Sequence, residues 1–98
     1  MLFVNILRWK PGLTREQQDE ALIKRSQWEY PAGMKVLGEY WLSSPSAGVI
    51  AIFEADDYEP IMEIDMAWSG FFDIDTTPAT TPEEGLQMGQ RIMERRST

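Results

Sequence analysis

The chain has 98 residues, 43% of them hydrophobic, and a formal net charge of −7 at pH 7, which is the size of a single domain, residues 1–98, around one core. An acidic chain is repelled by phosphate backbones and anionic lipid surfaces, so we expect neither a nucleic acid nor a membrane as partner. The sequence contains no cysteine and no histidine, which excludes disulfides, thiol catalysis and imidazole-ligated zinc or haem, and we expect no cofactor.

The first half of the chain predicts a strand, a helix and a second strand. Residues 2–10 alternate as a strand does, and because they lack the basic segment of a secretion signal we expect a cytoplasmic protein. Thr14 and Gln17 have the spacing of a capping box, which predicts a helix from there to about residue 29. Residues 34–42 predict the second strand. The helix residues expected to face the core are Ala21, Leu22 and Trp28.

The second half predicts a buried strand, a helix and a fourth strand. Residues 49–54 are almost wholly apolar, which is typical of a central strand buried on both faces. Asp56 or Asp57 is expected to cap the second helix. Residues 71–77 predict the fourth strand, which Pro78 is expected to end. The inner face of the second helix is expected to hold Ile61, Ile64, Asp65 and Trp68, which have helical spacing.

A third helix is predicted at about residues 82–95. Thr81 and Glu84 have the spacing of a second capping box, with a proline at the first helical position. The apolar stripe of this helix consists of Leu86, Ile92 and Met93, which is too sparse for a core element. We therefore expect the helix to lie over a sheet edge or to reach across to a partner subunit.

This order of elements predicts an α+β, ferredoxin-like βαββαβ sandwich with an antiparallel four-stranded sheet, a core at about residues 1–80 and an added C-terminal helix. Right-handed crossovers place the first and third strands in the centre. Such a sheet has helices on one face only, yet both faces of the first strand are largely apolar. We therefore expect a homodimer in which two sheets pack face to face, a dimeric α+β barrel.

Four segments carry a resemblance to a known family. They are MLFVNILRWKPGLT, VLGEYWL, GVIAIFEADD and AWSGFFDIDTTPATTPEEG. These segments, within about residues 1–86, resemble small bacterial proteins of unknown function that are assigned to the ferredoxin-like dimeric α+β barrel superfamily. That superfamily contains cofactor-free monooxygenases, isomerases, haem enzymes and plain ligand binders, so the resemblance implies a fold and leaves the chemistry open. The absence of histidine excludes the members with haem or a catalytic histidine as models.

Six residues are candidates for a pocket on the helix-free face of the sheet. Glu39 and Asn5 are the candidate catalytic groups, because a carboxylate in an apolar cavity has a raised pKa and serves as a general base. The phase of the second strand stays open, since Tyr40 and Trp41 are adjacent and both large. The plainer alternative is that the aromatic residues fill a dimer core and the acids lie at its rim. The candidate ligand-binding residues are Trp9, Trp41, Asp73 and Asp75.

Three functions are compatible with this pattern. The first is binding of a small apolar or aromatic molecule in a sheet-lined cavity. The second is a cofactor-independent monooxygenase or isomerase that acts on an aromatic compound, with Glu39 as base. The third is a purely structural or interaction module whose interior is filled by side chains. Asp73 and Asp75 form a D-x-D pair that could bind magnesium or calcium. Such a pair on an edge strand also serves to discourage sheet-to-sheet aggregation, so no metal is expected.

Overall fold

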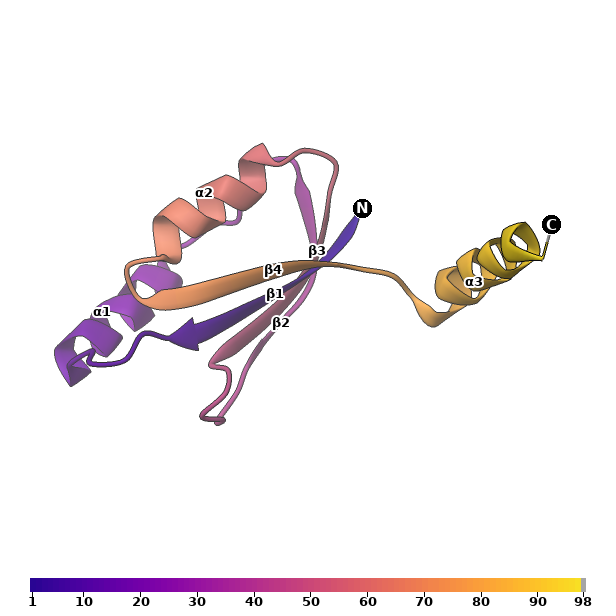
Figure 1. The fold of residues 1–98 in the computed structure, drawn as a ribbon. Coiled ribbons are helices and arrows are strands. Elements are labelled where there is room, and N and C mark those ends of the chain that lie inside the picture. Colours follow the sequence, from indigo (N-terminus) through magenta and orange to yellow (C-terminus); the bar gives the residue numbers. More distant parts are fainter. Residues whose placement is uncertain (98) are drawn as a thin grey trace.

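The computed structural model describes residues 1–97 and has the predicted order of elements (Figure 1). The predicted α+β architecture is confirmed, and it fits a ferredoxin-like fold. The elements are β1 (Leu2–Trp9), α1 (Arg15–Ser26), β2 (Met34–Trp41), β3 (Val49–Ala55), α2 (Glu59–Trp68), β4 (Phe72–Ala79) and α3 (Pro82–Arg96).

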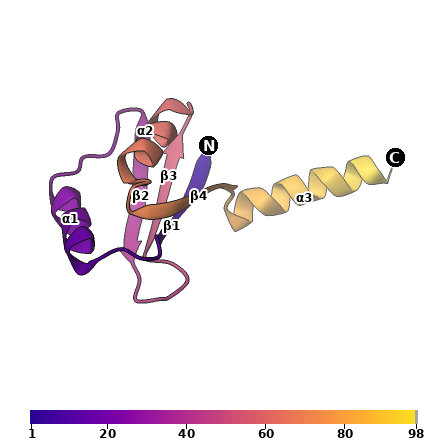
Figure 2. The ribbon, with the colours of Figure 1, turned by 60° about the vertical axis from the view of Figure 1, so that its left-hand side comes forward.

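The four strands form one antiparallel sheet in the order β2-β3-β1-β4. The prediction that the first and third strands are central and the other two are edges is confirmed. Helices α1 and α2 cover the same face of the sheet (Figures 1 and 2). β4 continues through Pro78 to Ala79, so the prediction that Pro78 ends it is wrong. Proline is tolerated there because β4 is an edge strand with one unpaired side.

The core lies between the sheet and the two helices. Phe53 of β3 is completely buried, and its ring stacks on that of Phe3 with centroids 5.8 Å apart. The inner face of α2 brings Ile61, Ile64 and Trp68 onto this layer, as predicted, and all three are buried. Burying each of these side chains stabilises the fold by about 1.5–3 kcal/mol.

The predicted capping box of the first helix is confirmed. The Thr14 hydroxyl accepts the Gln17 backbone N–H at 3.1 Å, and the Gln17 side chain accepts the Thr14 N–H at 2.8 Å. α1 ends at Ser26 rather than near residue 29. Ala21 faces the sheet and is buried, whereas Leu22 is 55% exposed, so its prediction as a core residue is wrong. Leu22 lies about 100° further round the helix, where it borders the space between α1 and the sheet and keeps half of its surface in solvent.

The predicted aspartate cap of α2 is wrong. Tyr58 is the N-cap residue and makes no side-chain hydrogen bond to the helix, which instead begins with a proline in its first turn. Asp56 lies 3.7 Å from the N-terminal ammonium group of Met1. The acidic pair therefore lies at the surface beside the chain start, and neither aspartate caps the helix.

α3 projects away from the rest of the molecule (Figures 1 and 2). The Thr81 hydroxyl accepts the Glu84 N–H at 3.2 Å, which confirms one half of the predicted box, while the Glu84 carboxylate accepts from the Thr80 hydroxyl at 3.4 Å. None of the α3 residues described is buried, and the helix covers no sheet edge. The Cα radius of gyration is 16.7 Å, against about 13 Å for a compact chain of this length.

A β-bulge in β2 sets which side chains face the helices. Val36 pairs with Phe53 and Gly38 pairs with Ile52, so Leu37 is an extra residue between two neighbouring pairs. One inserted residue reverses the alternation of a strand. Val36 faces the helices before the bulge, and Glu39 faces them after it.

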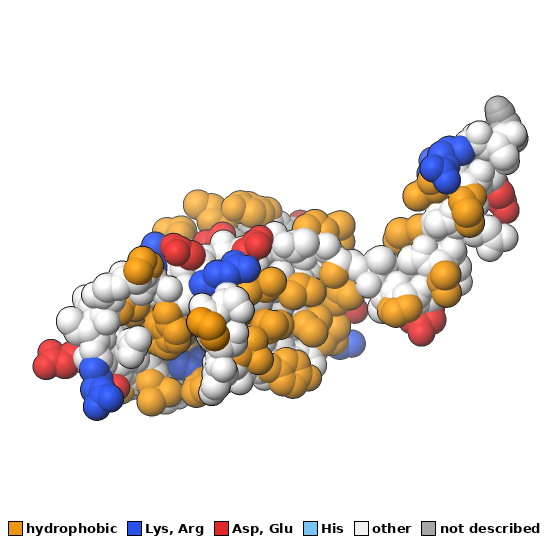
Figure 3. Space-filling view, turned by 60° about the horizontal axis from the view of Figure 1, so that its bottom comes forward, with side chains coloured by type: hydrophobic (Ala, Val, Ile, Leu, Met, Phe, Trp, Pro, Cys, Tyr) orange, Lys and Arg blue, Asp and Glu red, His pale blue; other side chains and the backbone are white. Residues whose placement is uncertain are grey.

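The other face of the sheet carries no helix. Its central strands present apolar side chains that are half-buried within one chain, and Leu37 and Tyr40 of β2 are 48% and 58% exposed. Figure 3, which brings the underside of Figure 1 forward, shows hydrophobic side chains gathered over the sheet body. The half-buried residues of this face include Val4, Ile6, Ile50 and Ile52. Within residues 1–97, none of the helices has the length and hydrophobicity that a membrane-spanning helix requires.

Candidate functional site

A row of facing residues crosses the sheet beneath the helices. Glu39 pairs with Ala51, Ala51 with Asn5, and Asn5 with Thr76. Directly paired residues of an antiparallel sheet share a face. Because Asn5 lies between Phe3 and Leu7, which pack against the helices, the whole row faces the helices as well. The prediction of the helix-free face is therefore wrong for Asn5, Trp9, Glu39 and Trp41.

A cavity of about 430 Å³ lies between this part of the sheet and α1. Small residues line the sheet side of the cavity and leave its volume open, among them Ala51 and Gly48. A Cβ on Gly48 would lie only 3.0 Å from Nε1 of Trp9, so glycine lets the Trp9 ring lie against the strand. The walls hold all four tryptophans of the chain and two further aromatic residues: Trp9, Trp28, Trp41, Trp68, Tyr30 and Phe72.

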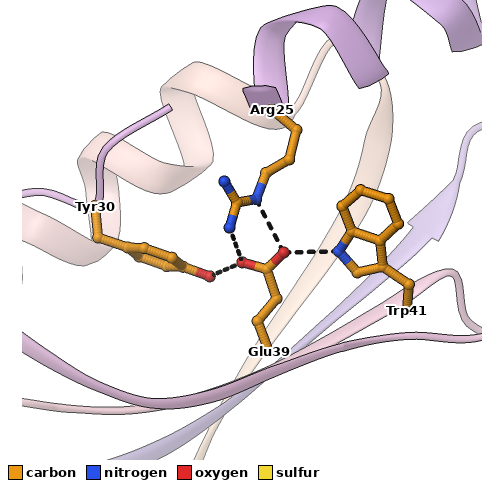
Figure 4. A network of polar contacts seen from close by, with 4 residues as sticks. All are labelled: Arg25, Tyr30, Glu39 and Trp41. Atoms are coloured by element: carbon orange, nitrogen blue, oxygen red, sulfur yellow. Dashed lines mark hydrogen bonds and ion pairs between the residues drawn. The ribbon is translucent and has the colours of Figure 1, made fainter. Parts of the chain in front are cut away.

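Glu39 is the centre of a polar network in the cavity wall (Figure 4). Arg25 of α1 donates two hydrogen bonds to the carboxylate, from Nε to Oε2 at 2.9 Å and from Nη2 to Oε1 at 3.0 Å. The Tyr30 hydroxyl donates to Oε1, and Nε1 of Trp41 donates to Oε2 at 2.7 Å. A carboxylate has about four acceptor positions, and all four are occupied here.

The network determines the charge state of Glu39. Burial alone would raise the pKa of this carboxyl group, but the hydrogen bonds from Arg25, Tyr30 and Trp41 outweigh it and lower the pKa. Burial and the hydrogen bond to Glu39 raise the pKa of the Tyr30 phenol. The hydrogen bond to Glu39 also raises the pKa of the Arg25 guanidinium. The raised carboxyl pKa expected of a general base is therefore wrong for Glu39, which is held as an anion.

Asn5 is the polar residue of the cavity floor, and its side chain is buried with 2% exposure. Its Oδ1 accepts a hydrogen bond of 2.7 Å from the Thr76 hydroxyl on the neighbouring strand. This bond uses the amide oxygen and leaves the Nδ2 group, a double donor, for a molecule in the cavity.

Asp73 and Asp75 do not line this cavity. They pair with Arg8 and Ile6, whose side chains point to the helix-free face. Asp73 lies 2.9 Å from the Lys10 ammonium, and the Asp75 carboxylate accepts from the hydroxyl of Thr77. Within residues 1–97, no group of three or more carboxylates lies close enough together to hold a metal ion.

The structure thus brings together Asn5, Trp9, Glu39 and Trp41, and it separates them from the two aspartates. Sequence reasoning missed Arg25, because a basic residue in the last turn of a helix is already explained by the helix dipole. The signal for it is Glu39, the one acidic residue of β2, which needs a cationic partner once buried.

The family model for a domain of unknown function, DUF3303, matches residues 1–93. Neither the curated proteins nor the solved structures contain a match to the chain.

Proposed function

The chain belongs to the DUF3303 family, and from its site we propose that it binds a small neutral aromatic molecule that carries a carbonyl or phenolic oxygen. The observation that carries this proposal is the cavity of about 430 Å³, with all four tryptophans in its walls. Small-molecule sites typically have volumes of about 300–1,000 Å³, apolar and aromatic walls and a few polar groups.

The polar groups of the cavity offer donors rather than acceptors. Asn5 presents an amide NH₂ group, and Arg25 has five N–H donors of which Glu39 takes two. A ligand with an acceptor oxygen satisfies them. The Arg25 charge is already balanced by Glu39, so an anionic ligand would bring a second negative charge without a new partner. These arguments favour a neutral ligand.

The geometry supports binding over the alternative of a cofactor-independent monooxygenase or isomerase. That chemistry requires a base that takes a proton from the substrate. All acceptor positions of Glu39 are occupied by Arg25, Tyr30 and Trp41, and its pKa is lowered. The third reading, a structural module with a filled interior, requires an interior without the open volume that lies against α1.

The test is calorimetric titration with two probes of similar size, 2-acetylnaphthalene and naphthalene. Asn5→Leu should weaken binding of the ketone about tenfold, which corresponds to one hydrogen bond of about 1.4 kcal/mol. The same variant should bind naphthalene at least as tightly as the native chain does. Thr76→Val is the matched control, because it removes the partner of Asn5 outside the cavity and keeps the Nδ2 donor. Equal loss of both probes in Asn5→Leu would contradict the assigned hydrogen bond, and no binding to the native chain would contradict the function.

The proposal includes a homodimer and a cytoplasmic location. The apolar helix-free face supports the dimer, since Val4, Ile6, Ile50 and Ile52 form a contiguous surface across two paired central strands. Two such faces packed together remove this surface from water. Fractionation of cells that express the tagged chain tests the location, and recovery with the membrane or exported fraction would contradict it.

A further inference from the structure

The projecting helix α3 is amphipathic, yet none of its described residues is buried against the rest of the chain. Its apolar residues lie on one stripe and stay exposed; Leu86 is 77% exposed and Met93 is 58% exposed. A 15-residue helix is marginally stable in water without tertiary contacts. The stripe also contains Gly85 and Gly89, each of which costs about 1 kcal/mol in a helix interior. These features favour a helix that another surface approaches closely.

The charges of α3 are divided along its length. Glu83 and Glu84 lie in its first turn, whereas Arg91, Arg95 and Arg96 lie toward its far end with the single acid Glu94, so the far end carries a net charge of +2 (three basic minus one acidic). Three acidic and three basic residues leave α3 neutral overall, so residues 1–81 carry the whole net charge of −7. The far end of the projecting helix shows its basic side chains in Figure 3. An acidic surface is its natural complement.

Residues 1–81 contain an acidic groove with a volume of about 440 Å³. It lies at the end of the sheet where β3 and β4 finish. Its apolar lining includes Phe3, Ile61 and Ile74, and its acidic residues include Asp57 and Asp65. Oδ1 of Asp65 is buried and has no hydrogen-bond partner within residues 1–97. A buried carboxylate oxygen in this state costs free energy unless a donor reaches it.

We propose that the far end of α3 from a second copy of this chain docks in this groove, with the Ile92 and Met93 side chains on the apolar lining and the arginines against Asp57 and Asp65. The mode is an amphipathic helix in a groove, for which apolar anchors at helical spacing and a charged rim are typical. Glycines on the docking stripe let the helix backbone approach the groove. This contact does not depend on ligand binding.

A second copy, rather than the helix of the same chain, fits the geometry. α3 begins three residues after β4 ends, close to Pro78 of the groove lining. It projects away from the sheet and from the other two helices (Figure 1). At 1.5 Å per residue, Arg91 lies about 14 Å beyond the first helical residue. The basic end of a chain's own helix is therefore remote from its own groove, whereas a copy related by a two-fold axis presents that end to it, and the exchange is reciprocal.

The test uses disulfide trapping, for which a chain without cysteine is ideal. Three single-cysteine variants are purified separately: Ile92→Cys on α3, Tyr58→Cys at the groove, and Ser44→Cys in the connection between β2 and β3 at the other end of the sheet. All three positions are exposed. Mixed pairs are oxidised mildly, and the masses identify the products. We expect Ile92→Cys to join Tyr58→Cys at least tenfold faster than it joins Ser44→Cys.

Several results would overturn the proposal. Equal rates for the two mixed pairs would mean random encounters, and a dominant Ile92→Cys homodimer would mean that two helices pair with each other. A double variant with Ile92→Cys and Tyr58→Cys in one chain that closes only internally would assign the groove to the chain's own helix.

Charge reversal provides a second measurement on the same mixture. Arg91→Glu with Arg95→Glu and Arg96→Glu in the Ile92→Cys chain should slow trapping at least tenfold, and Asp57→Arg in the Tyr58→Cys chain should restore part of the rate. Trapping that is indifferent to both changes would overturn the assigned charge pairing.

Discussion

At the scale of single residues, Glu39 is the side chain on which the site depends. Its carboxylate is 13% exposed and accepts hydrogen bonds from three side chains of two elements and a loop. Because Arg25 is 35% exposed, solvent screens part of the ion pair. Glu39→Gln places an NH₂ group against these donors, and we expect it to lower the free energy of unfolding by about 1–2 kcal/mol at pH 7.

The same variant has a pH signature. The pKa of Glu39 is lower in the folded chain than its ordinary value of 4.5, so its contribution is complete above that value and is lost as the pH falls through the folded pKa. The stability difference between the native chain and Glu39→Gln, measured by urea unfolding, should therefore be largest at pH 7 and shrink in acid. Glu29→Gln, an exposed control, should change stability by less than about 0.5 kcal/mol. A difference that stays constant down to pH 3 would contradict the assigned network.

The sequence identified four of the cavity residues but assigned them to the wrong face. The alternation of β1 correctly places Asn5 and Trp9 on one face and Arg8 on the other. It does not say which face the helices cover, because both sets of side chains are largely apolar. The contact between Arg25 and Glu39 could not be predicted from the sequence, since only tertiary packing brings this helix to the edge strand.

At the scale of elements, the bulge at Leu37 is the feature that turns Glu39 and Trp41 into the cavity. Deleting Leu37 leaves Val36 opposite Phe53 and Gly38 opposite Ile52, so both side chains should keep their face and the fold should persist. Deleting Tyr40 instead should move Trp41 to the helix-free face and cost about 2 kcal/mol more, because its hydrogen bond and packing are lost.

The measurement for the two deletions is the indole N–H spectrum by NMR. The Trp41 signal bonded to Glu39 should survive the deletion of Leu37 and disappear with the deletion of Tyr40. Survival in both variants, or loss in both, would mean that the bulge does not set the phase of the strand.

Element order was predictable from sequence, and a local irregularity was not. The alternating and helical periods locate every strand and helix within a few residues, including the Thr14 cap. The bulge escaped because one extra residue leaves no compositional mark, and Tyr40 and Trp41 are equally suited to an apolar face. The cap of α2 failed because Asp56 and Asp57 precede the helix too early to reach its free N–H groups.

At the scale of the whole molecule, the proposed dimer depends on the helix-free face. Ile52→Arg places a charge at its centre and should raise the dissociation constant at least 100-fold, since an unpaired charge would be buried between the sheets. Sedimentation equilibrium measures this as a shift from twice the chain mass of 11.3 kDa toward one chain. Met66→Arg, on the outer side of α2 and 73% exposed, is the control and should leave the mass unchanged. A native chain that sediments as a monomer at micromolar concentration would contradict the sheet-face contact.

The cavity is the centre of the account, and the four tryptophans around it make the most direct measurement simple. Titration of 2-acetylnaphthalene into ¹⁵N-labelled protein should shift the indole N–H signals of Trp9, Trp28, Trp41 and Trp68 with one common dissociation constant, while the backbone signals of α3 stay in place. Indole signals that do not move at the solubility limit of the probe, or shifts confined to the helix-free face, would contradict the claim that this cavity is the binding site.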